Sequence, residues 1–384
     1  MKINEKSTRR TEQHAKALIV VSAINIFKGG SLTIAREFLK ELDDAGSSSD
    51  SHSNIIVFCH ARDLYNDLQL KRTRFIEKPW SRKNWMMRLL YEYVWFWFWS
   101  WRKNVDAWIS LHDITPNVNA KRQYVYCHNP APFYSGGTVW RHEPSFELFR
   151  RFYKYLYKIN IYKNEGVIVQ QQWIRAEFIS RYKIKPGKVI VALPERKSGQ
   201  ISSKCYQRDR KRPFLIIYPA IPRPFKNFEV LLDAMVLLRP FAIELIVTID
   251  GRENRYARKL YERYKCLENV EFSGYMHHGE IMQLYAKADA MIFPSKLETW
   301  GLPMSEFKCF GKPIIAADLP YAHETLFDYA HKYYFEPSDH VRLAASIKAL
   351  CDGNLPPQPR PETLEYEWPI ARNWRELLGI MALN

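Results

Sequence analysis

Two glutamates in the C-terminal half of the chain have the type and spacing to act on a common ligand. Glu298 and Glu306 lie in residues 293–316, FPSKLETWGLPMSEFKCFGKPIIA. The apolar run before them predicts a buried strand that ends at Phe293, and Pro303 suits the first position of a helix. We therefore expect Glu298 on a loop and Glu306 in the first turn of the helix that follows.

Backbone amides on this loop could bind an anion. Amides that precede a helix point away from it and, with the helix dipole, suit a diphosphate. Glu298 would then lie beside a sugar on that diphosphate, and Glu306 could accept hydrogen bonds from two ribose hydroxyls. A glutamate in a first helical turn is, however, commonly just a favourable capping charge. The amides belong to Thr299, Trp300, Gly301 and Leu302.

A lysine near the start of the second half could supply positive charge. Lys226 lies in residues 218–227, YPAIPRPFKN, between a predicted strand and a predicted helix. Its ammonium could reach into a cleft and neutralise a departing diphosphate. On composition alone, a solvated lysine at a helix start is the simpler interpretation. Arg223 is close enough in sequence to add a second cation.

Two segments of the first half also place reactive groups beside predicted strands. Gly29 and Gly30 precede a predicted helix, where a glycine turn offers amides to a phosphate, although most such pairs are plain turns. His128, in VYCHNPAPFY, follows a predicted strand and precedes a proline-stiffened loop. A histidine there could stabilise charge or orient an acceptor, whereas a lone histidine is more commonly structural.

The elements that must position these residues alternate between short apolar runs and amphipathic stretches, which predicts an α/β protein with parallel sheets. Such sheets bind ligands beyond the carboxyl ends of their strands. In the first half we predict strands at 17–21, 54–58, 107–111, 124–126, 167–169 and 189–192, and helices at 31–42, 149–157 and 174–181. In the second half we predict strands at 213–218, 242–248, 270–272, 290–293 and 313–316, and helices at 227–238, 280–288, 303–310 and 341–351.

The chain length predicts two domains, because 384 residues exceed one ordinary core. Residues 194–212, PERKSGQISSKCYQRDRKR, are polar and aperiodic, which predicts a linker. We expect Rossmann-like domains over 1–196 and 212–365, with a last helix over 369–381 that packs back on the first domain.

The positive charge is concentrated in the first half. Residues 1–196 hold 32 Lys and Arg against 18 Asp and Glu, whereas the remainder holds 25 against 23. A basic surface attracts anionic lipids, lipid-linked diphosphates or nucleic acids, but no nucleic-acid-binding motif accompanies it. The polar first residues, through His14, lack the apolar core of a signal peptide and predict a cytoplasmic protein. The six cysteines show no CxxC spacing, which predicts reduced thiols.

The segment 80–101, WSRKNWMMRLLYEYVWFWFWSW, is the densest aromatic stretch of the chain. It is a poor membrane span, because Arg88 and Glu92 interrupt it and the uncharged run that follows is too short. Trp and Tyr favour the headgroup zone of a bilayer, and basic residues flank the segment. An interfacial membrane-binding element and a core helix with large side chains are equally compatible with this pattern.

The segment around the two glutamates resembles the signature of glycosyltransferase family four, in which two glutamates separated by seven residues flank a Gly-Leu-Pro core. Here TWGLPMS separates Glu298 from Glu306, FGKPIIA follows, and LYAKADAMIFPS precedes. The resemblance covers most of residues 213–352 and is traceable over the first half. It implies the GT-B architecture, two Rossmann-like domains facing a central cleft, and a retaining transfer from a nucleotide-activated sugar.

The resemblance also implies roles for single residues. Glu298 would hold hydroxyls of the donor sugar, Glu306 would hold the ribose, and His128 would lie near the transferred sugar. Many relatives carry an arginine five residues before the lysine, where this chain has Ile221. The expected catalytic residues are Glu298, His128 and Lys226. The expected donor-binding residues are Gly29, Gly30, Arg223, Tyr275, Thr299, Trp300, Gly301, Leu302 and Glu306.

The implied reaction transfers a sugar from a UDP- or GDP-sugar to a lipid-linked saccharide acceptor, as in bacterial O-antigen or capsule assembly. The first domain would bind the acceptor at the inner membrane surface, so we expect peripheral membrane association and no nucleic acid partner. The chain has no Asp-x-Asp triplet, and we expect no metal and no other cofactor. The alternatives are an epimerase or phosphorylase of the same fold, and a non-enzymatic basic protein that binds membranes or nucleic acids.

Overall fold

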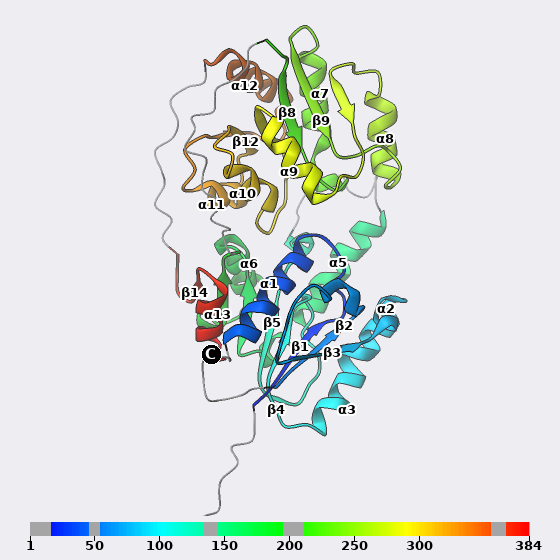
Figure 1. Cartoon of the computed structure of the whole chain (residues 1–384), viewed down its shortest axis with the longest axis vertical. Helices are drawn as coiled ribbons and strands as arrows, with labels where there is room; N and C mark the ends of the chain where they lie inside the picture. The colour runs from blue at the N-terminus through cyan, green and yellow to red at the C-terminus, as the bar shows by residue number, and fades with distance from the viewer. Residues whose placement is uncertain (1–16, 46–53, 134–143, 195–210, 355–365, 384) are drawn as a thin grey trace, which may run out of the picture. The chain divides into compact units, whose positions relative to one another are not determined.

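The computed structural model describes residues 17–45, 54–133, 144–194, 211–354 and 366–383 (Figure 1). Its strands are β1 (Leu18–Ala23), β2 (Asn54–Cys59), β3 (Thr73–Glu77), β4 (Val105–Ser110), β5 (Ala120–Tyr126), β6 (Gly166–Val169), β7 (Val189–Ala192), β8 (Phe214–Tyr218), β9 (Ile243–Val247), β10 (Val270–Phe272), β11 (Ala290–Phe293), β12 (Ile314–Ala317), β13 (Lys332–Phe335) and β14 (Ile370–Ala371). Its α-helices are α1 (Gly29–Ala45), α2 (Trp85–Leu90), α3 (Phe96–Trp101), α5 (Pro144–Lys158), α6 (Gln172–Tyr182), α7 (Phe228–Leu237), α8 (Arg255–Tyr264), α9 (His278–Lys287), α10 (Leu302–Lys308), α11 (Pro320–Leu326), α12 (His340–Asp352) and α13 (Trp374–Ile380).

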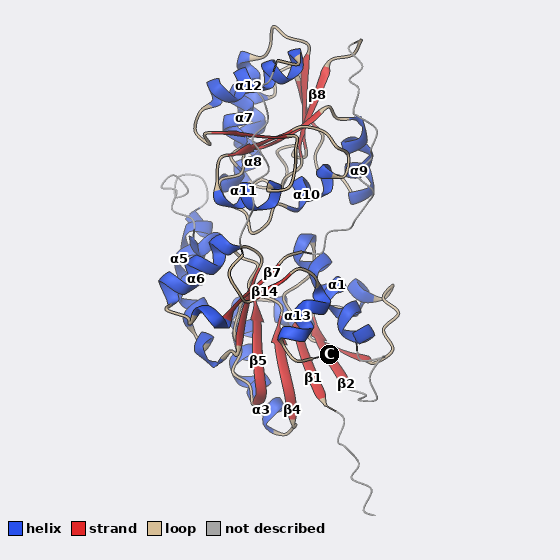
Figure 2. Cartoon of the chain, turned by 90° about the vertical axis from the view of Figure 1, so that its left-hand side faces the viewer, coloured by secondary structure: helices blue, strands red, loops and turns tan. Residues whose placement is uncertain are grey.

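The strands form two sheets whose paired strands are parallel, as the sequence predicts (Figure 2). The first has the order β14-β7-β6-β5-β4-β1-β2-β3, and the second has the order β10-β9-β8-β11-β12-β13. The chain divides into two compact units. One holds the described residues up to Tyr126, Lys163–Glu165 and the residues from Leu378 onwards; the other holds 127–162 and 166–377, as far as they are described.

In the first unit β1 pairs with β2 on one side and with β4 on the other. Five of the six residues of β1 are buried, as is typical of a central parallel strand covered on both faces. The chain end returns to this unit, where the Tyr124 hydroxyl donates a 3.2 Å hydrogen bond to the Met381 carbonyl. Gly29 is the first residue of α1, so this helix begins two residues earlier than the sequence predicts.

The second unit contains the complete six-stranded sheet. β8 leads outward to β9 and β10, and the chain then returns to β11 on the opposite side of β8. Neighbouring strands whose chain connections diverge in this way open a crevice at their carboxyl ends, which is where α/β sheets bind ligands. The core of this sheet is built from its fully buried strands β11 and β12 with α7 and α12 packed against them.

The Trp-rich segment divides its side chains between two environments. Trp95 and Trp99 pack edge-on against Phe58, with ring centroids 5.4 and 5.0 Å apart. The opposite side of α2, the π-helical turn Tyr91–Trp95 and α3 is exposed; its large apolar side chains are Trp85, Met86, Leu90, Val94, Trp97, Phe98 and Trp101. The segment therefore has a core face and a second, exposed apolar face. The core interpretation is confirmed for the first face, and membrane binding by the second face stays a prediction.

The two charges that interrupt this segment point into the protein. Glu92 is fully buried 3.4 Å from His112 Nδ1, and Arg88 donates to the His112 carbonyl at 3.0 Å. The other ring nitrogen of His112 lies 2.8 Å from the Ser22 hydroxyl. Burial raises the pKa of Glu92 to about 8. No helix among the described residues is both long enough and apolar enough to cross a bilayer.

Five elements of the described structure were not predicted from the sequence. They are β3, β13, β14, α8 and α11. The predicted linker falls largely on residues 195–210, which lie outside the described residues. The last helix, predicted over 369–381, is shorter; α13 begins at Trp374, and the residues before it form β14, which pairs with β7.

Candidate functional site

Two loops meet at the carboxyl ends of β8 and β11, the neighbouring strands whose connections diverge. The loop after β8 carries Lys226 and the loop after β11 carries Glu298. Lys296 N donates to the Phe225 carbonyl at 2.7 Å, and the Asn227 side chain donates to the Pro294 carbonyl at 3.1 Å. These bonds tie the two loops together, so the sheet positions both side chains at its ligand-binding edge.

Lys226 and Glu298 form an ion pair with each other. Both side chains are largely buried, with 16 % and 13 % of their surfaces exposed. Lys226 ends the short 3₁₀ turn Pro224–Lys226, and its carbonyl accepts a 2.8 Å hydrogen bond from the buried Tyr218 hydroxyl. Burial, together with the nearby Glu298 carboxylate, raises the pKa of Tyr218, so this hydroxyl stays protonated and donates.

The loop after Glu298 turns sharply into α10. Gly301 precedes the helix with φ of +80°, in the left-handed region that favours glycine, and an added Cβ would lie 2.6 Å from Met304 Cε. The Trp300 indole donates to Ser305 Oγ at 2.8 Å, and Thr325 Oγ1 donates to the Trp300 carbonyl. These contacts hold the loop from its buried side.

The amides of this loop are available to a ligand. Within the described residues, the backbone N–H groups of Thr299, Trp300, Gly301 and Leu302 donate to no other group of the chain. Amides without an intrachain acceptor at the start of a helix are suited to bind an anion, and the anion site stays a prediction. The structure therefore brings Lys226, Glu298 and the predicted anion-binding amides into one place.

Glu306 lies in the second turn of α10 and not in the first, where the sequence predicts it, because the helix begins at Leu302, one residue before Pro303. Its side chain contacts α9. Its carboxylate is 3.2 Å from His278 Nε2 and accepts a 3.4 Å hydrogen bond from the Tyr285 hydroxyl. About a third of the Glu306 side chain is exposed, so the carboxylate remains accessible. Burial and the neighbouring Glu306 carboxylate raise the pKa of Tyr285. The sequence did not identify these two contacts.

Arg223 and Tyr275 lie on the loops that flank this site. Arg223 is exposed directly before the 3₁₀ turn that ends at Lys226. Tyr275 is 79 % exposed on the loop between β10 and α9, with its ring 5.4 Å from that of His277. Gly274 precedes it with φ of +73°, and an added Cβ would lie 3.1 Å from Asp250 Oδ2. Tyr275 therefore has room to cover a planar ligand, which suits a nucleotide base.

The remaining predicted residues lie elsewhere. His128 is half-buried directly after β5, on a loop that Tyr157 of α5 holds through a 2.9 Å hydrogen bond to the Asn129 carbonyl. Gly29 and Gly30 belong to the other unit, at the start of α1, and Gly29 has φ of +68°. This left-handed conformation agrees with the glycine turn that the sequence predicts. The roles of these three residues remain predictions.

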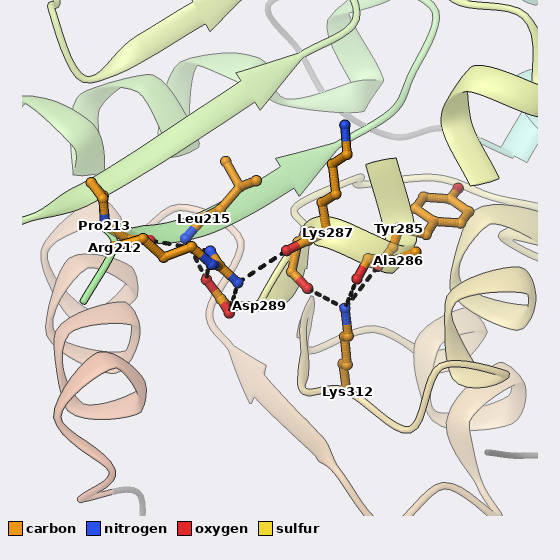
Figure 3. A network of polar contacts seen from close by, with 9 residues as sticks. Arg212, Pro213, Leu215, Tyr285, Ala286, Lys287, Asp289 and Lys312 are labelled. Carbon is orange, nitrogen blue, oxygen red and sulfur yellow. Dashed lines mark hydrogen bonds and ion pairs between the residues drawn. The ribbon is translucent and has the colours of Figure 1, made fainter. Parts of the chain in front are cut away.

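A buried polar network fixes the helix behind the site (Figure 3). The Lys312 ammonium donates to the carbonyls of Tyr285, Ala286 and Ala288 at the end of α9, at 3.0, 2.6 and 2.6 Å. Asp289 accepts from Arg212 and from Leu215 N at the start of β8. Burial lowers the pKa of Lys312 and raises that of Asp289. This network connects α9, β8 and β12 and so supports the residues that contact Glu306.

A buried carboxyl on α11 binds the start of α6. Glu324 accepts hydrogen bonds from the Gln172 amide at 2.8 and 3.0 Å, and the Gln171 side chain donates to Thr325 Oγ1 at 2.9 Å. Burial raises the pKa of Glu324 to about 7, against the opposing effect of the amides of Gln172 and Trp173. No sequence pattern pointed to this carboxyl.

Residues 202–365 match the family model described as glycosyl transferases group 1. An O-antigen chain mannosyltransferase of Salmonella typhimurium is 23 % identical over 257 residues, which cover 63 % of this chain and 68 % of the relative. An alpha-monoglucosyldiacylglycerol synthase of Streptococcus pneumoniae is 27 % identical over 51 % of this chain and 47 % of its own length. The crystal structure of a glycosyltransferase from Rickettsia africae has the same fold, with a TM-score of 0.62, 18 % identity and 88 % coverage of both chains.

Proposed function

Because this chain belongs to the group 1, or family four, glycosyltransferases and has the GT-B fold, we propose that it transfers a hexose from a UDP- or GDP-sugar to a lipid-linked saccharide with retention of anomeric configuration. The observation that carries this proposal is the Lys226–Glu298 pair beside four amides that have no acceptor within the described residues. A cation, an anion site and a carboxylate for sugar hydroxyls are the groups that such a donor requires.

The reaction proceeds on one face of the sugar. The bond between the anomeric carbon and the diphosphate oxygen breaks, and the acceptor oxygen bonds to the same carbon from the same side. The proton of the acceptor hydroxyl passes to the departing phosphate. Lys226 and the loop amides stabilise the charge that develops on the diphosphate. Glu298 binds sugar hydroxyls and positions the ring, and it forms no covalent bond.

The nucleotide half of the donor occupies the α9 and α10 side of the site. Glu306 accepts hydrogen bonds from the ribose hydroxyls, which replace its contacts to His278 and Tyr285 or add to them. Tyr275 and the backbone around Gly274 line the base. Lys226 and the helix-start amides supply the charge that a metal ion would otherwise provide, so we propose that no divalent ion is required.

Two further observations support the proposed acceptor and the proposed cellular location. The Salmonella relative is named for O-antigen chains and the Streptococcus relative for a diacylglycerol glycolipid. This chain also presents exposed aromatic side chains on α2 and α3 and a basic first half. These features support a lipid-linked acceptor of O-antigen or capsule type and peripheral association with the inner membrane.

The test is a transfer assay with purified protein, a panel of UDP- and GDP-sugars, and membrane lipid extract as acceptor. We expect one donor to give product with the anomeric configuration of the donor by NMR, in buffer with excess EDTA. Conversion of the donor sugar without acceptor would identify an epimerase. A protein whose melting temperature is insensitive to UDP, GDP and their sugars would not be a glycosyltransferase of this kind.

A further inference from the structure

The helix α5 carries an exposed apolar stripe that the core does not use. Leu148, Phe152 and Tyr155 are 65, 51 and 59 % exposed, and Ile159, directly after the helix, is exposed as well. Their spacings of four, three and four residues keep them within about 40° of one line along a helix. They therefore form a continuous stripe rather than scattered surface positions.

The opposite face of α5 is buried where its side chains are described. Tyr153, Leu156 and Tyr157 are buried, and the Tyr157 ring packs 5.1 Å from Phe178 of α6 and 6.2 Å from Phe133. Because this face already anchors the helix, the exposed stripe is not needed to hold α5 against the core. A second apolar face of this size on a surface helix is typical of an interaction site.

Positive charge borders the stripe. Lys154 and Lys158 are exposed on one side of it, and Lys154 Nζ lies 4.9 Å from the Tyr155 ring. The sequence of residues 144–163 holds five Lys and Arg and a single acid. A second copy of the same face would oppose like charges, whereas an anionic bilayer matches both the cations and the apolar side chains.

We propose that α5 docks on an anionic bilayer, with Phe152, Tyr155 and Ile159 in the interfacial zone and the lysines at the headgroups. The buried face of the same helix holds the loop of His128 through the Tyr157 hydroxyl. Docking would therefore fix this loop close to the membrane surface. Docking itself is independent of the proposed function. Only the inference that the His128 loop meets a lipid-linked acceptor rests on that function.

The test compares three variants of the full chain by co-sedimentation with phosphatidylcholine vesicles containing about one third phosphatidylglycerol. The apolar variant is Phe152→Ser/Tyr155→Ser/Ile159→Ser, and the charge variant is Lys154→Glu/Lys158→Glu. The matched control, Val236→Ser/Leu237→Ser/Val341→Ser, changes exposed apolar side chains of α7 and α12.

We expect both α5 variants to lose about tenfold in vesicle partitioning, while the control variant binds like the wild type. All four proteins should keep the same melting temperature and the same shift with UDP or GDP, which separates this proposal from the proposed function. Unchanged partitioning of the α5 variants would overturn the docking proposal even if the donor still binds. Self-association that depends on Phe152 in size-exclusion chromatography would assign the stripe to a second copy and overturn it as well.

Discussion

Lys226 and Glu298, 72 positions apart in the sequence, are bonded to each other at the carboxyl edge of the second sheet. In the proposed function, each side chain is thus held in place by the group that it would share with the donor. The pair keeps two charges neutralised in a largely buried location, where a diphosphate and a sugar would compete for them.

Glu298→Gln is expected to lower transfer by at least about 100-fold while nucleotide binding is retained. The amide keeps the size of the side chain but removes the negative charge that orders Lys226 and the sugar. The measurement is kcat with the preferred donor together with the melting-temperature shift by the free nucleotide. Near-normal turnover would contradict the role given to Glu298. Glu271→Gln, at an exposed residue of β10, is the matched control.

Glu306→Gln is expected to weaken binding of the nucleoside diphosphate by about tenfold or more, since a charged hydrogen bond contributes about 1.5–3 kcal/mol. Titration calorimetry measures this effect. Tyr285→Phe and His278→Ala, which remove the neighbours of this carboxylate, should have smaller effects because the carboxylate itself remains. A Glu306→Gln protein with unchanged affinity would contradict the ribose-binding role and leave Glu306 with its contacts to α9 alone.

Gly301→Ala is expected to destabilise the protein by about 1 kcal/mol and to reduce donor binding. Alanine is strained at φ of +80°, and its methyl group displaces the end of Met304. Gly279→Ala in α9, where an added Cβ meets nothing within 4 Å, is the control and should be neutral or stabilising. Urea unfolding with and without nucleotide measures both effects, and equal behaviour of the two variants would refute the strain argument.

The buried Glu324 predicts a pH-dependent stability. Its folded pKa of about 7 lies above the ordinary value of 4.5, so the folded protein binds this proton more tightly than the unfolded chain. The stabilisation is complete below about pH 4.5 and is lost as the pH rises through 7. At pH 8 the Glu324→Gln variant should therefore be more stable than the wild type by up to about 3 kcal/mol, and at pH 5 by much less. Denaturant unfolding at both pH values checks this, and a constant difference between the proteins would show that Glu324 does not titrate in this range.

The exposed aromatic face of α3 predicts a second membrane contact. Trp97→Ser/Phe98→Ser/Trp101→Ser should weaken vesicle binding without loss of stability, because these side chains are exposed. Trp95 and Trp99 are unsuitable for this test: they pack on Phe58, and their removal should cost about 3–5 kcal/mol each. Co-sedimentation measures the loss of vesicle binding, and thermal melting measures any loss of stability. Unchanged vesicle binding of the triple variant would exclude this face of α3 as a membrane contact.

The parallel sheets were predictable because their central strands are continuous apolar runs. β7, β10 and β11 coincide with the predicted ranges. By contrast, α8, RYARKLYERY, has so many charges that its apolar periodicity is hard to detect. Its one clear signal is Asn254, whose side chain caps the helix by accepting from Ala257 N at 2.8 Å.

The site was predictable where its residues follow one another in the sequence. The loop from Glu298 to Glu306 is such a stretch, and it turns into a helix as predicted, although α10 begins at Leu302 and so places Glu306 in the second turn instead of the first. The contacts from His278 and Tyr285 to Glu306 were not predictable, because they depend on how α9 packs beside α10. Glu324 was missed for the same reason, since only the folded chain brings α11 to the start of α6.

Lys312 gives α9, which contacts Glu306, a particular mechanical property. Its ammonium has three protons, and three carbonyls at the end of α9 accept hydrogen bonds from it. A displacement of α9 away from β12 would separate this buried cation from all three carbonyls, which costs free energy. The end of α9 therefore acts as a stiff template set during folding, and any freedom that the proposed donor needs to enter and leave would have to come from other parts of the chain.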